Sequence, residues 1–83
     1  MYYKQKTSDE HINAIESNIK GLDSRQAKIE ITHYLCWSLA GNDNKANRQE
    51  LVLHLTGNNI PKSKCGIYAI EEILFNKYNL KEQ

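Results

Sequence analysis

Histidine and cysteine are the residue types in this sequence that most directly suggest chemistry. His33 and Cys36 lie three positions apart, which places them on one face of a helix. With His54 and Cys65 they would make a Cys2His2 set, a ligand combination that zinc accepts. Structural zinc sites usually draw their ligands from two close pairs, however, and only the first pair is close here. The spacing therefore favours Cys36 as a small residue of an apolar helix face, and we predict no metal or other cofactor.

Nucleophilic catalysis needs a nucleophile, a base and a group that orients the base. Cys36 and His33 have suitable residue types, but a separation of one helical turn does not by itself aim the thiol at a substrate. The sequence contains no Gly-rich phosphate loop and no G-x-S-x-G motif. Glu71 and Glu72 are predicted to lie on a solvated helix face rather than in a cleft. A chain of 83 residues also leaves little volume for a substrate pocket, so we predict that it is not an enzyme.

The length and composition of the chain predict one small globular domain over residues 1–83. Apolar residues make up 40% and charged residues 25% of the chain, which is close to ordinary globular composition. Eleven Lys and Arg against ten Asp and Glu leave a net charge of +1, which excludes a uniformly polybasic protein. The mean hydropathy is −0.69, and no apolar run approaches the roughly 18–20 residues of a membrane span. Two cysteines without an apolar leader segment predict a cytoplasmic chain with reduced thiols and no membrane partner.

Turn residues divide the chain into a frayed N-terminus, residues 1–7, and four helical segments. Three of the four glycines follow apolar-periodic segments, where helices commonly end. Thr7 and Glu10 have the spacing of a capping box, and Asn47 is the preferred N-cap of the third segment. No stretch alternates long enough to indicate a strand. We therefore predict an all-α domain with helices over residues 8–20, 24–40, 47–56 and 62–78.

The second helical segment is more apolar than one covered face requires. Its stretch YLCWSLA, residues 34–40, is apolar nearly all round. A domain of this size obtains only about 3–5 kcal/mol from its own core, and self-association buries more apolar surface. Aromatic residues are enriched at the cores of protein interfaces. We therefore predict a homodimer whose interface contains Tyr34, Leu35, Trp37 and Leu39. The alternative is that Trp37 anchors the core of a single chain.

The third and fourth segments have the outline of a helix-turn-helix, in which Lys62 and Lys64 open the second helix. Four cations and two carboxylates give residues 43–64 a formal charge of +2. The predicted contacts with a partner or a nucleic acid are Lys45, Arg48, Lys62 and Lys64. The linker after Gly57 is longer than the tight turn of this motif, and few base-reading residues open the last segment. Weak contact with DNA phosphates is therefore expected before sequence-specific binding.

The order of features from Ala27 to Tyr78 is an amphipathic helix ending in YLCWSLAGND, an Asn-rich loop, the short helix NRQELVLHLT and the final helix IYAIEEILFNKY. This order resembles the YmgB/AriR family of small enterobacterial regulators over roughly residues 25–78. The matching positions are Gly41, Asn42, Asn47, Leu51, Leu55, Ile70 and Leu74. The cysteine pair and the linker with Pro61 depart from the family pattern.

The resemblance implies a helical homodimer that acts as a connector protein in two-component signalling. Family members are linked to biofilm and acid-resistance control, and the resemblance implies non-specific DNA binding but no catalytic or ligand residue. The expected partners are a second copy, a signalling or transcription-regulatory protein and, weakly, DNA. An inhibitor, immunity or anti-defence protein that caps one protein target is the alternative, because small size and near-neutral charge suit it equally well. A helix-turn-helix repressor is the third hypothesis.

Overall fold

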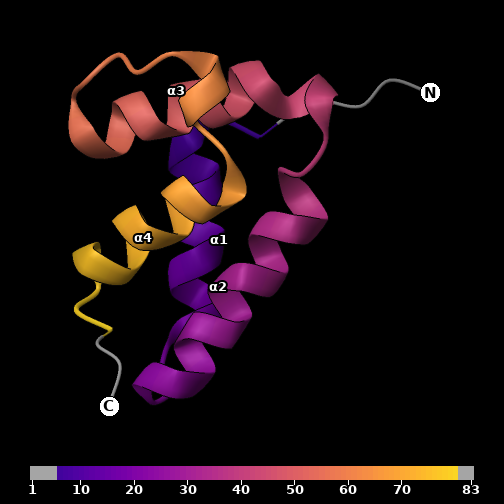
Figure 1. Ribbon diagram of the computed structural model, residues 1–83. Coiled ribbons are helices and arrows are strands. Elements are labelled where there is room, and N and C mark those ends of the chain that lie inside the picture. Colours follow the sequence, from indigo (N-terminus) through magenta and orange to yellow (C-terminus); the bar gives the residue numbers. More distant parts are fainter. Residues whose placement is uncertain (1–5, 81–83) are drawn as a thin grey trace.

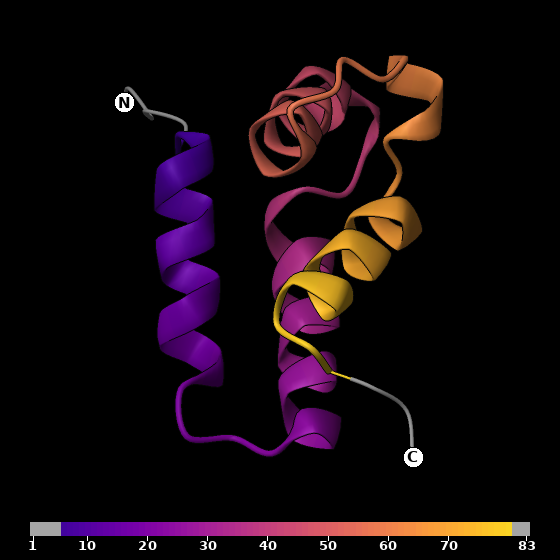
Figure 2. The same ribbon diagram turned by 90° about the vertical axis from the view of Figure 1, so that its left-hand side faces the viewer.

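The computed structural model describes residues 6–80, which form four α-helices and no β-strand (Figure 1). The helices are α1 (Ser8–Ile19), α2 (Ser24–Ser38), α3 (Lys45–Thr56) and α4 (Ile67–Lys77), with two short 3-10 turns, η1 (Asn42–Asn44) and η2 (Lys62–Lys64). The prediction of an all-α fold is confirmed. Helix α2 lies between α1 and α4, and α3 crosses one end of this layer (Figure 2).

The predicted capping box at the beginning of α1 is present. The backbone N–H of Glu10 donates to the Thr7 hydroxyl at 3.2 Å, and the backbone N–H of Thr7 donates to the Glu10 carboxylate at 2.8 Å. These two bonds satisfy donors that the first turn of a helix leaves without intrahelical partners. Thr7 is thus held in place. The rest of the predicted frayed segment falls mostly on residues 1–5, which lie outside the described residues.

Helix α2 is capped by Asp23, whose carboxylate accepts the backbone N–H of Gln26 at 2.9 Å. It ends at Ser38, two residues earlier than predicted. Leu39 already has a φ of −131°, and Gly41 has a φ of +101°, which a residue with a side chain rarely adopts. The chain therefore turns sharply into η1 before it enters α3.

The predicted beginnings of the third and fourth helices are wrong. Helix α3 begins at Lys45, so Asn47 lies inside its first turn and donates to the Asn44 side chain at 3.1 Å. The predicted helix over residues 62–78 splits into η2 and α4. Cys65 has non-helical torsion angles (φ −107°, ψ 50°) and Gly66 is extended, so the chain leaves the helical conformation between the two elements.

All four helices contribute to one hydrophobic core. Its fully buried members are Ile15, Ile31, Leu35, Leu39, Leu51, Val52, Cys65, Ile70 and Leu74. Cys65 fills a core position, whereas Cys36, for which the sequence favoured an apolar core environment, is exposed to solvent. The core therefore lies on the inner side of α2 and leaves the outer side of that helix uncovered.

Candidate protein-binding surface

The His and Cys residues that suggested metal or nucleophile chemistry do not converge. Cys65 is buried, with its sulfur 3.4 Å from the Pro61 carbonyl oxygen, and Cys36 is exposed on α2. His54 on α3 pairs instead with Asp9 on α1, at 3.0 Å between Nε2 and Oδ1. Within residues 6–80, no group of three or more His, Cys, Asp or Glu side chains lies close enough together to hold a metal ion.

Two of the four predicted interface residues are buried inside the single chain. Leu35 is 0% exposed and Leu39 is 1% exposed, because α1 and α4 pack against this side of α2 and core residues of α3 join the same cluster. They belong to the core, and as folded they offer no surface to a second copy. Trp37, in contrast, is 79% exposed. It is therefore not the anchor of the single-chain core, which was the alternative prediction.

Tyr34, the remaining predicted interface residue, is half-buried and tied to α1. Its hydroxyl lies 2.7 Å from Nδ1 of His11, and the two rings meet edge to face. Burial lowers the pKa of His11, the charge of Lys6 lowers it further, and Glu10 opposes the shift. Burial also raises the pKa of Tyr34. Both side chains are thereby favoured in their neutral forms, as a buried hydrogen-bonded pair requires.

The outer face of α2 carries an exposed row of side chains at four-residue spacing, which lie on one side of the helix. We call this row the exposed stripe of α2; it consists of Arg25, Ile29, His33 and Trp37. Ile29 is 59% exposed, and the His33 ring lies 6.0 Å from the Trp37 ring. Two large apolar side chains on one uncovered helix face are the main apolar feature of this surface.

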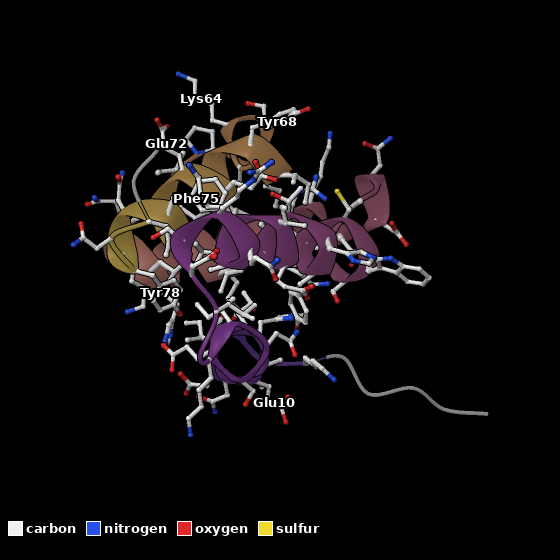
Figure 3. All side chains as sticks on the ribbon, turned by 90° about the horizontal axis from the view of Figure 1, so that it is seen from below. Glu10, Lys64, Tyr68, Glu72, Phe75 and Tyr78 are labelled. Carbon is white, nitrogen blue, oxygen red and sulfur yellow. The ribbon has the colours of Figure 1, made fainter. Side chains whose placement is uncertain are left out.

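A recess lies on each side of the exposed stripe. The larger, the α2/α4 recess, has a volume of about 440 Å³ and is lined by Lys28, Ile29, Thr32, His33 and Phe75. The ammonium group of Lys28 lies 5.4 Å from the centre of the Phe75 ring. Figure 3 shows Phe75 between α4 and α2, and Tyr68 on the outer side of α4.

The smaller recess has a volume of about 290 Å³ and lies between α2 and the end of α1. Its lining residues are Asn18, Glu30, His33, Tyr34 and Trp37. His33 borders both recesses and therefore occupies the middle of this surface. The arrangement offers apolar contact and shallow cavities, which suit protein binding better than chemistry on a small substrate.

Arg48, a predicted nucleic-acid contact, is only 7% exposed and serves the fold instead. Its Nε donates to the Cys65 carbonyl at 2.9 Å, and its Nη1 donates to the carbonyls of Leu39 at 2.6 Å and Gly41 at 2.7 Å. These bonds tie the end of α2 and the residue after η2 to α3. A cation is also favourable beside the carbonyl end of a helix.

Lys45, Lys62 and Lys64 are exposed, as a contact with an anionic partner requires. The helices around them, however, lack the compact turn of a helix-turn-helix. Ten residues, 57–66, separate α3 from α4 and contain η2. The motif uses a turn of about 3–4 residues, so α4 is not presented as a recognition helix by this geometry.

Glu71 is a buried residue that the sequence interpretation placed on a solvated face. It is 9% exposed, and its Oε2 has no hydrogen-bond partner among the described residues. Its spacing from Ile67 and Leu74, four positions after one and three before the other, puts it on the covered side of α4. This spacing is visible in the sequence and could have predicted that Glu71 is buried. Glu72 next to it is exposed, as predicted.

Comparisons with known proteins identify no relative: no family model, no curated protein and no solved structure matches this chain. The resemblance to the YmgB/AriR family consequently stays a prediction. Among residues 6–80, the longest helices are too short and too polar to cross a bilayer.

Proposed function

We propose that this chain is a non-enzymatic regulatory protein that works as a homodimer, assembled through the exposed stripe of α2. The observation that supports it is the exposure of Trp37 (79%) and Ile29 (59%) on one face of one helix. Buried aromatic residues are the usual anchors of protein interfaces, and apolar patches rimmed by polar groups commonly mark them. Control of gene expression through a signalling or transcription-regulatory partner, as the resemblance implies, is part of this proposal.

The exposed lysines would supply a second contact on the same molecule. Lys62 and Lys64 lie on η2, and Lys45 begins α3. Three cations support weak, salt-sensitive phosphate contact rather than sequence reading. A gel shift with duplex DNA that disappears when Lys62 and Lys64 are changed to Glu would support this contact, and an unchanged shift would contradict it.

The exposed stripe also favours a second candidate function, that of an inhibitor capping one specific protein target. The same Trp37 and Ile29 would then bind a different protein, and the chain itself would be a monomer. The two functions differ in what covers the stripe, so the mass of the purified chain in solution separates them.

Light scattering at about 5 and 500 μM measures that mass over a range typical of weak to moderate dimers. We expect a mass near twice 9.6 kDa at the higher concentration for the wild type. The Trp37→Ala variant should be a folded monomer at both concentrations, because Trp37 is largely exposed in the single chain. Tyr68→Ala, which removes an aromatic ring that is 85% exposed on α4, is the matched control and should remain dimeric. A monomeric wild type at both concentrations would contradict the homodimer and leave the inhibitor function.

A further inference from the structure

A third recess lies at the end of the molecule where α1 begins and α2 ends, and which α3 crosses (Figure 2). We call it the α1/α3 recess; it has a volume of about 280 Å³ and is lined by Lys6, His11, Ser38, Leu39, Asn44 and Asn47. Five of these six residues are polar, and none of the six is a carboxylate. The lining therefore favours a polar ligand that is not a cation.

The imidazole of His11 is the buried polar group of this recess. The residue is only 7% exposed, and its Nδ1 lies 2.7 Å from the Tyr34 hydroxyl. Nε2 has no hydrogen-bond partner among the described residues, and unlike Oε2 of Glu71 it is not an enclosed atom. Nε2 thus keeps contact with solvent, and His11 meets solvent at the recess that it lines.

Hydrogen bonds on α2 determine what Nε2 offers to a ligand. Burial raises the pKa of Tyr34, and a side-chain hydrogen bond with Ser38 opposes this shift. Such a bond lowers the pKa of a phenol when the phenol oxygen accepts it, because it stabilises the ionised form. The hydroxyl hydrogen of Tyr34 is then left for Nδ1 of His11, and Nε2 carries the imidazole hydrogen. His11 therefore presents an N–H donor to the recess.

Positive charge gathers around this donor. Lys6 lowers the pKa of His11 further than burial alone does, and among the described residues it has no ion-pair partner. Arg48 donates to the carbonyl of the lining residue Leu39, and all its hydrogen bonds go to carbonyl groups rather than to a carboxylate. Helix α3 begins at the recess with neither a side-chain cap nor an acidic residue in its first turn, which leaves the positive end of its dipole uncompensated. These charges favour an anion.

Two carboxylates are close in sequence to the lining residues but do not line the recess. Glu10 accepts the backbone N–H of Thr7 at 2.8 Å within the capping box, and it raises the pKa of His11 less than Lys6 lowers it. Asp43 on η1 is exposed to solvent. Neither carboxylate therefore neutralises Lys6.

We propose that the α1/α3 recess binds a small oxyanion of the phosphate class, inorganic phosphate or a phosphate monoester, between the Nε2–H of His11 and the ammonium group of Lys6. A phosphate group carries about 1.5–2 negative charges at neutral pH, which matches the several positive groups around the recess better than one carboxylate does. Hydrogen bonds from cationic and N–H donors to phosphate oxygens are short and strong. Neither residue belongs to the exposed stripe, so this inference does not depend on the homodimer.

Nuclear magnetic resonance of the histidine rings tests the site, because the chain has three histidines and His33 on α2 serves as an internal control. Phosphate is added at about pH 7.5, where it is mostly dianionic, and potassium chloride keeps the ionic strength constant. We expect the ring signals of His11 to shift and saturate with a dissociation constant of about 1 mM or lower. The signals of His33 should not saturate. Bound phosphate should also raise the pKa of His11, because it places a negative charge beside the imidazole.

Lys6→Met tests the second contact. Its side chain is exposed, so its loss should leave the fold intact while the dissociation constant for phosphate rises at least about fivefold. Lys20→Met, which removes an exposed lysine after the other end of α1, is the matched control and should bind phosphate as the wild type does. Tighter binding of methyl phosphate than of inorganic phosphate would support an ester as the ligand, and weaker binding would support the free anion.

Four outcomes decide the inference. A His11 shift that grows linearly with phosphate, or that chloride alone reproduces, would overturn the site. Unchanged affinity in Lys6→Met, or equal losses in Lys6→Met and Lys20→Met, would overturn the specific contact with Lys6. Acetate that binds more tightly than phosphate would overturn the phosphate class. A saturable shift that is absent from His33 and weakened only by Lys6→Met would establish the site.

Discussion

Helix α2 has two stripes of side chains that differ in their neighbours more than in their own character. The inner stripe, Ala27, Ile31, Leu35 and Leu39, is at most 2% exposed and belongs to the core. The exposed stripe includes Ile29 and Trp37, which are equally apolar but have no helix packed over them. Apolar character alone therefore does not decide which side of a helix forms the core. The other helices cover one side and leave the other side exposed.

The largest expected effect is the difference in stability between a variant of the inner stripe and a variant of the exposed stripe. Leu35→Ala should lower the free energy of unfolding by about 2–5 kcal/mol, because it leaves a cavity in the core. Trp37→Ala should change it by no more than about 0.5 kcal/mol where the chain is monomeric, because the ring is mostly exposed. Urea denaturation of both variants at low protein concentration measures the difference. Equal losses would show that the two stripes do not differ as described.

Arg48 should give the next largest effect, because it connects the inner side of α2 to the rest of the fold. Arg48→Met keeps much of the side-chain length but removes the three hydrogen bonds to the carbonyls of Leu39, Gly41 and Cys65. We expect a loss of about 1.5–3 kcal/mol in urea denaturation. Lys62→Met, at an exposed position, is the control. If Arg48→Met is as stable as the wild type, the fold does not require these bonds, and Arg48 is again a candidate contact for a partner.

Glu71 and Glu72 offer the same comparison on α4, between a buried and an exposed carboxylate. Glu71→Gln should raise the free energy of unfolding by about 1 kcal/mol, since a neutral amide costs less to bury than a carboxylate without a partner at Oε2. Glu72→Gln should leave it unchanged. The midpoints of urea denaturation at neutral pH measure both. A destabilised Glu71→Gln variant would mean that the carboxylate is favourable where it lies.

The smallest expected effect is a pH dependence through His11, which anchors Tyr34 of α2. Its pKa is lowered from 6.5 in the folded chain, chiefly by burial, so the unfolded chain binds the proton more readily. The contribution of His11 to the free energy of unfolding should therefore be fully present above pH 6.5 and decrease as the pH falls below that value. His11→Gln should reduce this dependence relative to the wild type. Identical pH profiles for the two proteins would contradict the assignment.

The four helices could be predicted from sequence because their signals are local. Apolar periodicity identified each segment, and the capping box at Thr7 and Glu10 located one helix beginning. The helix predicted over residues 62–78 begins too early because Lys62 and Lys64 were assigned to its first turn rather than to a separate one. The chain forms one there, but only as η2, before Cys65 and Gly66 depart from helical geometry.

The candidate surface could be predicted only in part. The stretch of residues 34–40 was correctly identified as having excess apolar character, but successive residues advance about 100° around a helix, so Leu35 and Trp37 lie on nearly opposite sides. They could not both face one partner. Which side the rest of the chain covers depends on α1, α3 and α4. The burial of Arg48 likewise depends on carbonyl groups from distant parts of the sequence.

The most direct test of the exposed stripe uses its own tryptophan, since Trp37 is the single Trp of the chain. Its emission can be recorded over a dilution series from about 1 to 500 μM, the range in which dimers of micromolar affinity dissociate. The homodimer predicts that emission shifts to shorter wavelength as concentration rises, because the indole leaves water. Tyr68→Ala should show the same shift. Emission typical of an indole in water at every concentration would contradict the claim that a second copy covers this face of α2.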